Sequence, residues 1–118
     1  MKLTVLDRLS MGEDTPLERF LSLGETTFYD STSPEEIEKR VADVDVIITN
    51  KVKITEAVME KAKNLKLICV FATGYDNIDI NAAKMRNIAV CNVPGYSTNS
   101  VTLFTVATAL ALYSHLTE

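Results

Sequence analysis

Two loops of this sequence carry residue types that suit the binding of a small anion. The first covers residues 71–79 and reads Phe-Ala-Thr-Gly-Tyr-Asp-Asn-Ile-Asp. Its small residues let the backbone approach a ligand closely, and unpaired N–H groups in such a turn form a concavity for a carboxylate or phosphate. The same residues also suit a plain connection, in which Asp76 or Asn77 closes the turn and Asp79 caps the next helix. Both readings stay open at this point.

The second loop, residues 92–100, reads Asn-Val-Pro-Gly-Tyr-Ser-Thr-Asn-Ser and ends where a helix is expected to begin. A helix N-terminus attracts anions, and Tyr96 would offer a hydroxyl at the mouth of a cleft. Lys51, just after an apolar run, is the nearest plausible cation, although a lysine in a loop is often only solvated. The two loops lie side by side if the strands before them are neighbours.

Other chemistries find no support in the residue pattern. The single histidine, His115, stands near the C-terminal end of the last expected helix, where a cation is favoured for structural reasons. The sequence contains neither a GxGxxG nor a Walker-type loop. We therefore assign no catalytic residue and no metal ligand to this chain. Cys69 and Cys91 lie inside apolar runs, which predicts buried thiols in a reducing cytoplasm rather than a disulfide.

Five β-rich apolar runs alternate with helix-patterned segments, and these elements must position both loops. The runs are Lys2–Leu6, Thr26–Tyr29, Val44–Thr49, Leu67–Phe71 and Ile88–Val93. Such alternation implies right-handed crossovers and a parallel sheet covered on both sides. We predict an α/β fold, a flavodoxin-like five-stranded parallel sheet of order 2-1-3-4-5 with helices on both faces. Ligands of such sheets bind beyond the carboxyl ends of the strands, which nominates Asp7, Asn50-Lys51, Thr73-Gly74-Tyr75 and Pro94-Gly95-Tyr96.

Local capping signals predict the helix boundaries. In chain order we expect a helix capped by Thr15 with Pro16 at its first position and Gly24 past its end, one opening at Ser33-Pro34, one capped by Thr55, one over Asp79–Arg86 followed by a left-handed Asn87, and a last one capped by Thr98, Asn99 or Ser100.

The last expected helix, residues 101–113, carries no charge and is apolar all round. A surface helix on a lone domain should have a polar face, so we expect this one to pack against a second domain or subunit outside this chain. The alternative is a helix central to this domain's own core, with Thr102, Thr105 and Thr108 outward. The segment is well short of the ~20 residues that a membrane span needs.

Length, composition and charge limit the classes of protein and of partner that remain possible. The chain has 118 residues, 47% of them hydrophobic, with 12 Lys plus Arg against 16 Asp plus Glu. These values describe one ordinary domain with no need for a disulfide. The net charge of −4 argues against nucleic acid as a partner. A charge at Asp7 comes too early for a signal-peptide core, so we expect a cytoplasmic protein with no membrane partner.

Taken together, the two loops resemble a known family. The motif residues are Ala72–Asp79, Ala82-Ala83, Arg86-Asn87-Ile88, Val90, Asn92–Thr98 and Ser100-Val101. They are similar to the D-isomer-specific 2-hydroxyacid dehydrogenases, and Thr49-Asn50-Lys51 with Ile54-Thr55 resembles the glycerate dehydrogenase and hydroxypyruvate reductase branch. The resemblance is strong from residue 67 to 101 and generic before residue 44. One departure is Thr102-Leu103, where the family usually has Ala followed by Glu or Gln.

The resemblance implies a division into lobes. Residues 1–99 would be the flavodoxin-like substrate-binding lobe, and residues 100–118 an interdomain helix leading to a Rossmann lobe that is absent here. That lobe would bind NAD or NADP and would contain the catalytic arginine, glutamate and histidine. The whole protein would be an NAD(P)-dependent oxidoreductase, a homodimer, transferring hydride between nicotinamide and a small D-2-hydroxy acid or 2-oxo acid of the glycerate/hydroxypyruvate, glyoxylate or lactate type. The chain alone would be inactive.

The resemblance also carries over a few site residues. The backbone of Thr73-Gly74-Tyr75 would face the substrate carboxylate, and Thr73 would also touch the nicotinamide end of the cofactor. Tyr96 and Ser97 would lie near the substrate, and Lys51 would line the pocket.

Two non-catalytic alternatives share the expected topology. A receiver-like signalling domain needs an acidic pair after the first strand and a phospho-accepting Asp after the third, where this chain has Asp7 and Thr49-Asn50. A flavodoxin-like binding domain needs a phosphate loop after the first strand, which Asp7-Arg8-Leu9-Ser10 does not supply.

Overall fold

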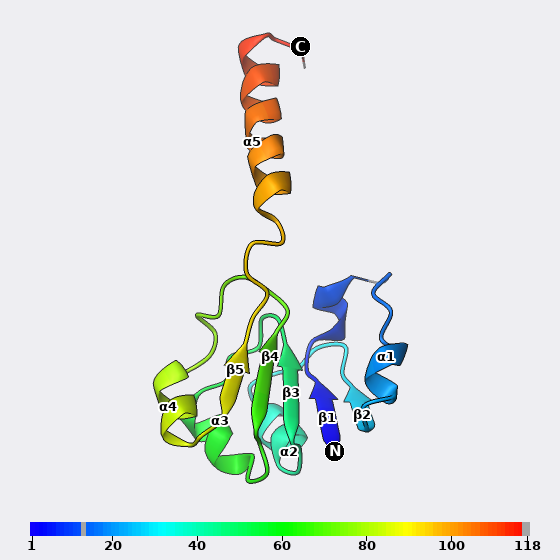
Figure 1. Cartoon of the computed structure of the whole chain (residues 1–118), viewed down its shortest axis with the longest axis vertical. Coiled ribbons are helices and arrows are strands. Elements are labelled where there is room, and N and C mark those ends of the chain that lie inside the picture. Colours follow the sequence, from blue (N-terminus) through cyan, green and yellow to red (C-terminus); the bar gives the residue numbers. More distant parts are fainter. Residues whose placement is uncertain (13, 117–118) are drawn as a thin grey trace.

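The computed structural model describes residues 1–12 and 14–116 and contains a five-stranded sheet. Its strands are β1 (Lys2–Val5), β2 (Glu25–Phe28), β3 (Val46–Thr49), β4 (Leu67–Val70) and β5 (Ala89–Cys91). All neighbouring pairs are parallel, in the order β2-β1-β3-β4-β5 (Figure 1). The predicted α/β class, strand order and direction are therefore confirmed. The strands are shorter than the apolar runs because several runs continue into the loops that follow.

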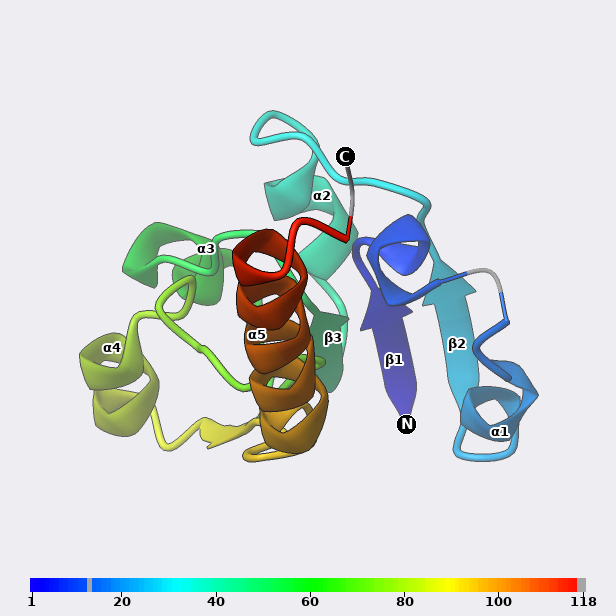
Figure 2. The ribbon, with the colours of Figure 1, turned by 90° about the horizontal axis from the view of Figure 1, so that it is seen from above.

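Helices cover the two faces of this sheet unequally (Figures 1 and 2). The helices α2 (Ile37–Val41), α3 (Glu56–Lys61) and α4 (Ile80–Met85) pack on one face, where Ile47 and Ile68 are completely buried. The short α1 (Glu18–Leu21) packs on the other face, and a 3-10 turn, η1 (Arg8–Met11), follows β1. Doubly covered strands read as unbroken apolar runs, as β3 does.

On the face of the sheet where α1 packs, the side chains become more exposed to solvent from β1 toward β5. Phe20 of α1 meets Phe71 edge-on, with ring centroids 5.9 Å apart. Val5 and Ile48 beneath it are buried, whereas Cys69 on β4 is half-buried and Cys91 on β5 is exposed. The prediction of two buried thiols is therefore wrong, because the side chains on this face shield Cys69 only in part and leave Cys91 exposed. Both cysteines are free thiols.

Three capping predictions are confirmed. The Thr55 hydroxyl accepts a hydrogen bond from the Val58 N–H, and the Asp79 carboxylate accepts one from the Ala82 N–H at 2.9 Å. Asn87 follows α4 in the left-handed conformation, with φ of 55°. Each of these contacts joins residues close in sequence, which is why local patterns predict them.

The starts of α1 and α2 differ from prediction. Thr15 does not cap α1, because its hydroxyl donates back to the Met11 carbonyl at 2.6 Å and the helix begins only at Glu18. Ser33 does not cap α2. Its N–H donates to the side chain of Glu36, and the Glu36 N–H donates to the Ser33 carbonyl, so a turn forms before α2 begins at Ile37.

The last helix, α5 (Thr98–Tyr113), stands away from the sheet (Figure 1). It has Ser97 at its N-cap, without a side-chain capping bond, in place of the three candidates predicted for that role. None of its residues is buried, and Leu103 and Phe104 are 72% and 75% exposed. The alternative of a core helix is therefore wrong. That a second domain or subunit packs against α5 stays a prediction. The division of the chain after residue 99 into a substrate-binding lobe and an interdomain helix also stays a prediction, and residues 117–118 of that helix lie outside the described residues. Over the described ranges, no helix is both long and apolar enough to cross a membrane.

Acidic side chains near the N-terminus make the stability depend on pH. The Lys2 ammonium, hydrogen-bonded to Asp43, holds the pKa of Asp43 below its usual value, and the Lys2 N–H does the same for the pKa of Asp45. A lowered folded pKa stabilises the fold above the unfolded value, near 4, and that contribution is lost as the pH falls through the folded value. We expect the free energy of unfolding, measured in urea, to decrease below about pH 4. Replacing Asp43 and Asp45 by Asn should make the free energy of unfolding depend less steeply on pH in this range. An unchanged pH dependence in the double variant would contradict the role of these two carboxylates.

Candidate functional site

The carboxyl ends of the strands meet at the edge of the sheet from which α5 departs (Figure 1). A cavity of about 420 Å³ opens there between the segments that follow β1, β3, β4 and β5. It is lined by Ser10, Met11, Thr15, Asn50, Phe71, Val93 and Tyr96. The chain order reverses between β1 and β3, and ligands of open parallel sheets bind outside such a switch point.

The loop after β4 presents a run of unpaired donors at this edge. Within the described residues, the backbone N–H groups of Thr73, Gly74 and Tyr75 donate to no protein acceptor. All three residues are exposed, so these donors are open to a ligand. Successive free N–H groups can bind carboxylates and phosphates, so anion binding by this loop stays a prediction. The expected capping of α4 by Asp79 is present beside these donors.

The loops after β4 and β5 are tied to each other. The Thr73 hydroxyl donates to the Val93 carbonyl at 3.1 Å, and the Asn92 amide donates to the Thr73 carbonyl at 2.8 Å. The Val93 N–H also donates to the Ala72 carbonyl. A movement of one loop therefore moves the other.

Side chains also hold the loop after β3 in one conformation. The buried Asp7 carboxylate accepts hydrogen bonds from the N–H groups of Asn50, at 3.0 Å, and Lys51, at 2.6 Å. From the other side, the Asn77 amide donates to the carbonyls of Asn50 and Val52. We call residues 50–52 the braced loop. Asp7 thus holds residues 50–52 in place, and both of its carboxylate oxygens already accept hydrogen bonds from the protein.

Charges of both signs surround this edge. Lys51 is exposed and forms no ion pair in the part of the chain that the structure describes. Arg8 is neutralised by Asp30 at 2.7 Å. The Asp76 carboxylate lies beside Gly74, where an added Cβ would meet it at 3.3 Å. Lys51 is therefore a cation available to an anionic ligand.

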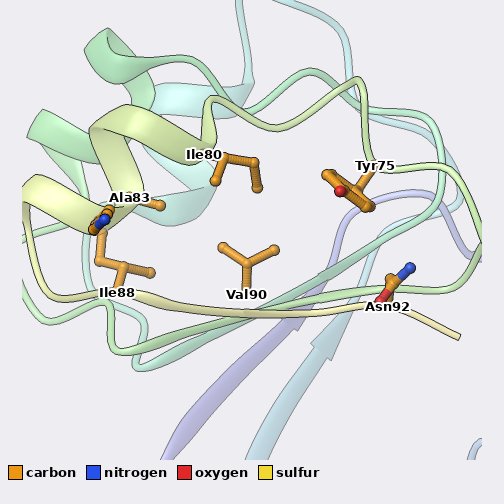
Figure 3. A pocket seen from close by; sticks show the side chains of 7 residues that line it. Tyr75, Ile80, Ala83, Ile88, Val90 and Asn92 are labelled. Atoms are coloured by element: carbon orange, nitrogen blue, oxygen red, sulfur yellow. The ribbon is translucent and has the colours of Figure 1, made fainter.

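The predicted site residues share the edge but not one cavity. Tyr96 lines the central cavity, and Ser97 is half-buried at the start of α5. Lys51 lines a separate groove with Asp7 and Asp30. Tyr75 lines a different groove of about 420 Å³ beside α4 and β5 (Figure 3). This groove also contains Asn92 and the apolar side chains of Ile80, Ala83, Ile88 and Val90. In this structure Tyr75 and Lys51 do not converge.

Three cavity residues were missed by sequence reasoning: Ser10, Met11 and Thr15. They lie in or just after η1, a 3-10 turn without a regular apolar period. Their position directly after the first strand was the only available signal, since that loop must also reach the carboxyl edge of the sheet.

The family assignment follows from comparison with known proteins. Residues 4–116 match the family model described as D-isomer specific 2-hydroxyacid dehydrogenase, catalytic domain. The chain belongs to this family. It is 38% identical over 120 residues to a hydroxypyruvate reductase of Blautia hydrogenotrophica and 37% identical over 112 residues to a glycerate dehydrogenase of Methylorubrum extorquens. These alignments cover 98% and 94% of this chain but only 37% and 35% of the relatives.

Solved structures of D-2-hydroxyacid dehydrogenases share this fold. One is the D-lactate dehydrogenase of Aquifex aeolicus complexed with NAD and lactic acid, with a TM-score of 0.76 and 28% identity. The match covers 95% of this chain and 33% of that one. The chain thus spans about a third of the length of these relatives.

Proposed function

We propose that the whole protein is an NAD(P)-dependent oxidoreductase that transfers hydride between nicotinamide and a small D-2-hydroxy acid or 2-oxo acid, and that this chain is its substrate-binding lobe. The candidate substrates are of the glycerate/hydroxypyruvate, glyoxylate or lactate type. The names of the two curated relatives support the first of these classes. The observation that carries the proposal is the run of free N–H groups at Thr73, Gly74 and Tyr75.

These donors suit the one group that all such substrates share. A 2-oxo acid must have its carboxylate held so that hydride adds to one face of the adjacent carbonyl. Backbone N–H groups at residues 73–75 would hold the carboxylate, and Lys51 would add a positive charge at the edge of the site. Tyr96 and Ser97 would line the side that α5 approaches.

The chain itself does not fit the diphosphate of a dinucleotide. Its four glycines, at 12, 24, 74 and 95, are too far apart for a phosphate-binding turn at a helix N-terminus. We assign only Thr73 to the cofactor, at the nicotinamide end, where its exposed position allows contact from outside the lobe. The remaining cofactor contacts and all catalytic residues belong to the Rossmann lobe expected beyond this chain, and NAD or NADP would supply the hydride.

Two assays test this function. The whole protein should oxidise NADH or NADPH with hydroxypyruvate, glyoxylate or pyruvate, and the 118-residue chain alone should not. Absence of turnover by the whole protein with all three acids would overturn the proposal. Turnover by the purified chain would overturn the assignment of its catalytic residues to another lobe.

The role of Lys51 has its own test. In the whole protein we expect Lys51→Met to raise KM for the 2-oxo acid about tenfold with kcat within about twofold, because a lost ion pair weakens ground-state and transition-state binding alike. Lys53→Met, an exposed lysine two residues away, is the matched control and should leave KM unchanged. Equal effects of the two substitutions would mean that only the net charge matters.

The structure supports the receiver-like and flavodoxin-like alternatives less well than the proposed oxidoreductase. A receiver-like domain needs free carboxylates after its first strand, but both oxygens of Asp7 accept bonds from the braced loop. In the described residues, no group of three or more His, Cys, Asp or Glu side chains could hold a metal ion. Labelling by acetyl phosphate, or a yellow flavin-containing protein, would favour these alternatives.

Three further proposals concern the oligomeric state of the protein, its location in the cell and its partners. A homodimer is supported by the apolar, uncovered α5, which offers a surface that soluble monomers usually avoid. A cytoplasmic location is supported by the two free thiols. The acidic net charge of −4 disfavours nucleic acid as a partner.

A further inference from the structure

Two peptide groups at the start of the loop after β4 are held by the segment that follows β5. The Ala72 carbonyl accepts a hydrogen bond from the Val93 N–H at 3.0 Å. The next carbonyl, that of Thr73, accepts one from the side-chain amide of Asn92 at 2.8 Å. Two successive carbonyls are therefore turned toward the same neighbouring segment, residues 92–93.

These two bonds also fix the direction of two N–H groups. A trans peptide group is planar, and its C=O and N–H point in opposite directions. The Ala72 carbonyl shares its peptide group with the Thr73 N–H, and the Thr73 carbonyl shares its peptide group with the Gly74 N–H. Because both carbonyls are turned toward residues 92–93, both N–H groups point away from that segment. Two successive N–H groups on one side of a turn form a concavity that suits an anion.

The second of these donors depends on a side chain. The Ala72 carbonyl is held by a backbone N–H, which any residue except proline would supply at position 93. Among the described residues, only the Asn92 amide donates to the Thr73 carbonyl. Glycine has wide conformational freedom, so the peptide group between Thr73 and Gly74 turns over easily when nothing holds its carbonyl. Asn92 supplies the restraint.

We propose that Asn92 is a positioning residue for the substrate carboxylate, because its amide keeps the Gly74 N–H turned toward the bound acid. This role rests on the proposed function and adds a residue that does not itself touch the substrate. Asn92 is half-buried directly after β5, and it lines the groove beside α4 instead of the central cavity. It therefore acts through the Thr73–Gly74 peptide group.

Steady-state kinetics of the whole protein test this role, with whichever of hydroxypyruvate, glyoxylate and pyruvate it reduces fastest. We expect Asn92→Ala to raise KM for the acid about tenfold and to leave kcat within about threefold, because a carboxylate that is held less firmly loses ground-state and transition-state binding alike. KM for the nicotinamide cofactor should stay within about twofold. General damage to the fold would instead lower kcat and weaken the binding of both substrates.

A second substitution and a matched control accompany this variant. Asn92→Asp keeps the shape of the side chain, but an ionised carboxylate has no proton to donate to the Thr73 carbonyl. Its KM for the acid should rise at least as much as that of Asn92→Ala. Asn64→Ala is the control, because the Asn64 amide donates to the Asp43 carboxylate at 3.0 Å just before β4, at the opposite edge of the sheet. Both KM values should be unchanged in this control.

A binding measurement separates this role from the reductase activity. Pyruvate and the oxidised nicotinamide cofactor exchange no hydride, so pyruvate can be titrated into the ¹⁵N-labelled whole protein with that cofactor present. We expect the Gly74 amide resonance to shift as pyruvate binds. In Asn92→Ala the pyruvate concentration at the midpoint of this shift should be about tenfold higher, whereas Asn64→Ala should leave it unchanged.

Several outcomes would overturn the role of Asn92. They are an unchanged KM for the acid in Asn92→Ala, a normal KM in Asn92→Asp, and parallel losses for the acid and the cofactor. If the whole protein reduces none of the three acids, the proposed function fails, and the titration then decides the role of Asn92. A Gly74 resonance that ignores pyruvate, or that responds equally in Asn92→Ala, overturns it, and a response about tenfold weaker in the variant supports it. If Asn92→Ala fails to fold by circular dichroism, Asn92→Asp takes its place in both measurements.

Discussion

Asp7→Ala is expected to lower the free energy of unfolding by about 3 kcal/mol, because it leaves two N–H groups of the braced loop without a partner. The Asp7 side chain is nearly inaccessible, with the residue 6% exposed, and it bonds to both Asn50 and Lys51. Hydrogen exchange adds a local measurement. We expect the amides of Asn50 and Lys51 to exchange about a hundredfold faster, while those of Ile47 and Ile48 in β3 change only with the global stability.

Asp30→Ala is the matched control for this substitution. Asp30 is also an aspartate at the carboxyl edge, but its ion pair with Arg8 lies at the surface, with 62% of the Asp30 side chain exposed. Exposed pairs contribute roughly 0–1 kcal/mol. In Asp7→Asn one oxygen remains as an acceptor, so an intermediate loss is expected. If Asp7→Ala cost no more than Asp30→Ala in urea denaturation, the carboxylate would not be what holds the loop.

Gly24→Ala is expected to cost about 3 kcal/mol or more, through a steric collision. A Cβ on residue 24 would overlap the carbonyl oxygen of Met1 and crowd the side chain of Leu3. The same carbonyl accepts the Glu25 N–H at 3.0 Å, the bond that begins the pairing of β1 with β2. The collision cannot be relieved by a side-chain rotation, because the obstacle is backbone.

Gly95→Ala is the control that distinguishes the cost of a steric collision from the cost of a left-handed backbone conformation. Gly95 has a φ of 73°, but an added Cβ there would meet nothing within 4 Å. We expect this variant to lose only about 1–2 kcal/mol, the cost of a left-handed alanine. Urea denaturation of the two variants under identical conditions makes the comparison. Similar losses in both would refute the collision at residue 24.

Local signals predicted those parts of the fold whose bonds are local. The Thr55 and Asp79 caps bond to an N–H three residues on, and Asn87 takes its conformation from its own backbone. Prediction failed where a competing bond intervened. Thr15 has the right residue type for a cap but donates backwards to Met11, and Ser33 closes a turn with Glu36 instead of starting a helix.

The candidate site divides in the same way. Both loops were recognisable because small residues and turn formers stand together after apolar runs, and neighbouring strands bring them side by side. The role of Asn77 was not recognisable. In the sequence it is a turn residue, whereas in the structure its amide reaches the braced loop more than twenty residues away. Nothing in a local pattern encodes a partner at that separation.

By itself, the sequence determined the order of strands, the two site loops and the absence of a dinucleotide fingerprint, because period, turn chemistry and spacing are properties of neighbouring residues. Only the tertiary structure decided that Asp7 and Asn77 hold residues 50–52, that Lys51 and Tyr75 line separate grooves, and that Cys69 and Cys91 stand opposite each other on neighbouring strands. These facts depend on strand register and on hydrogen bonds between loops. Both are set by packing between segments that are distant in the chain.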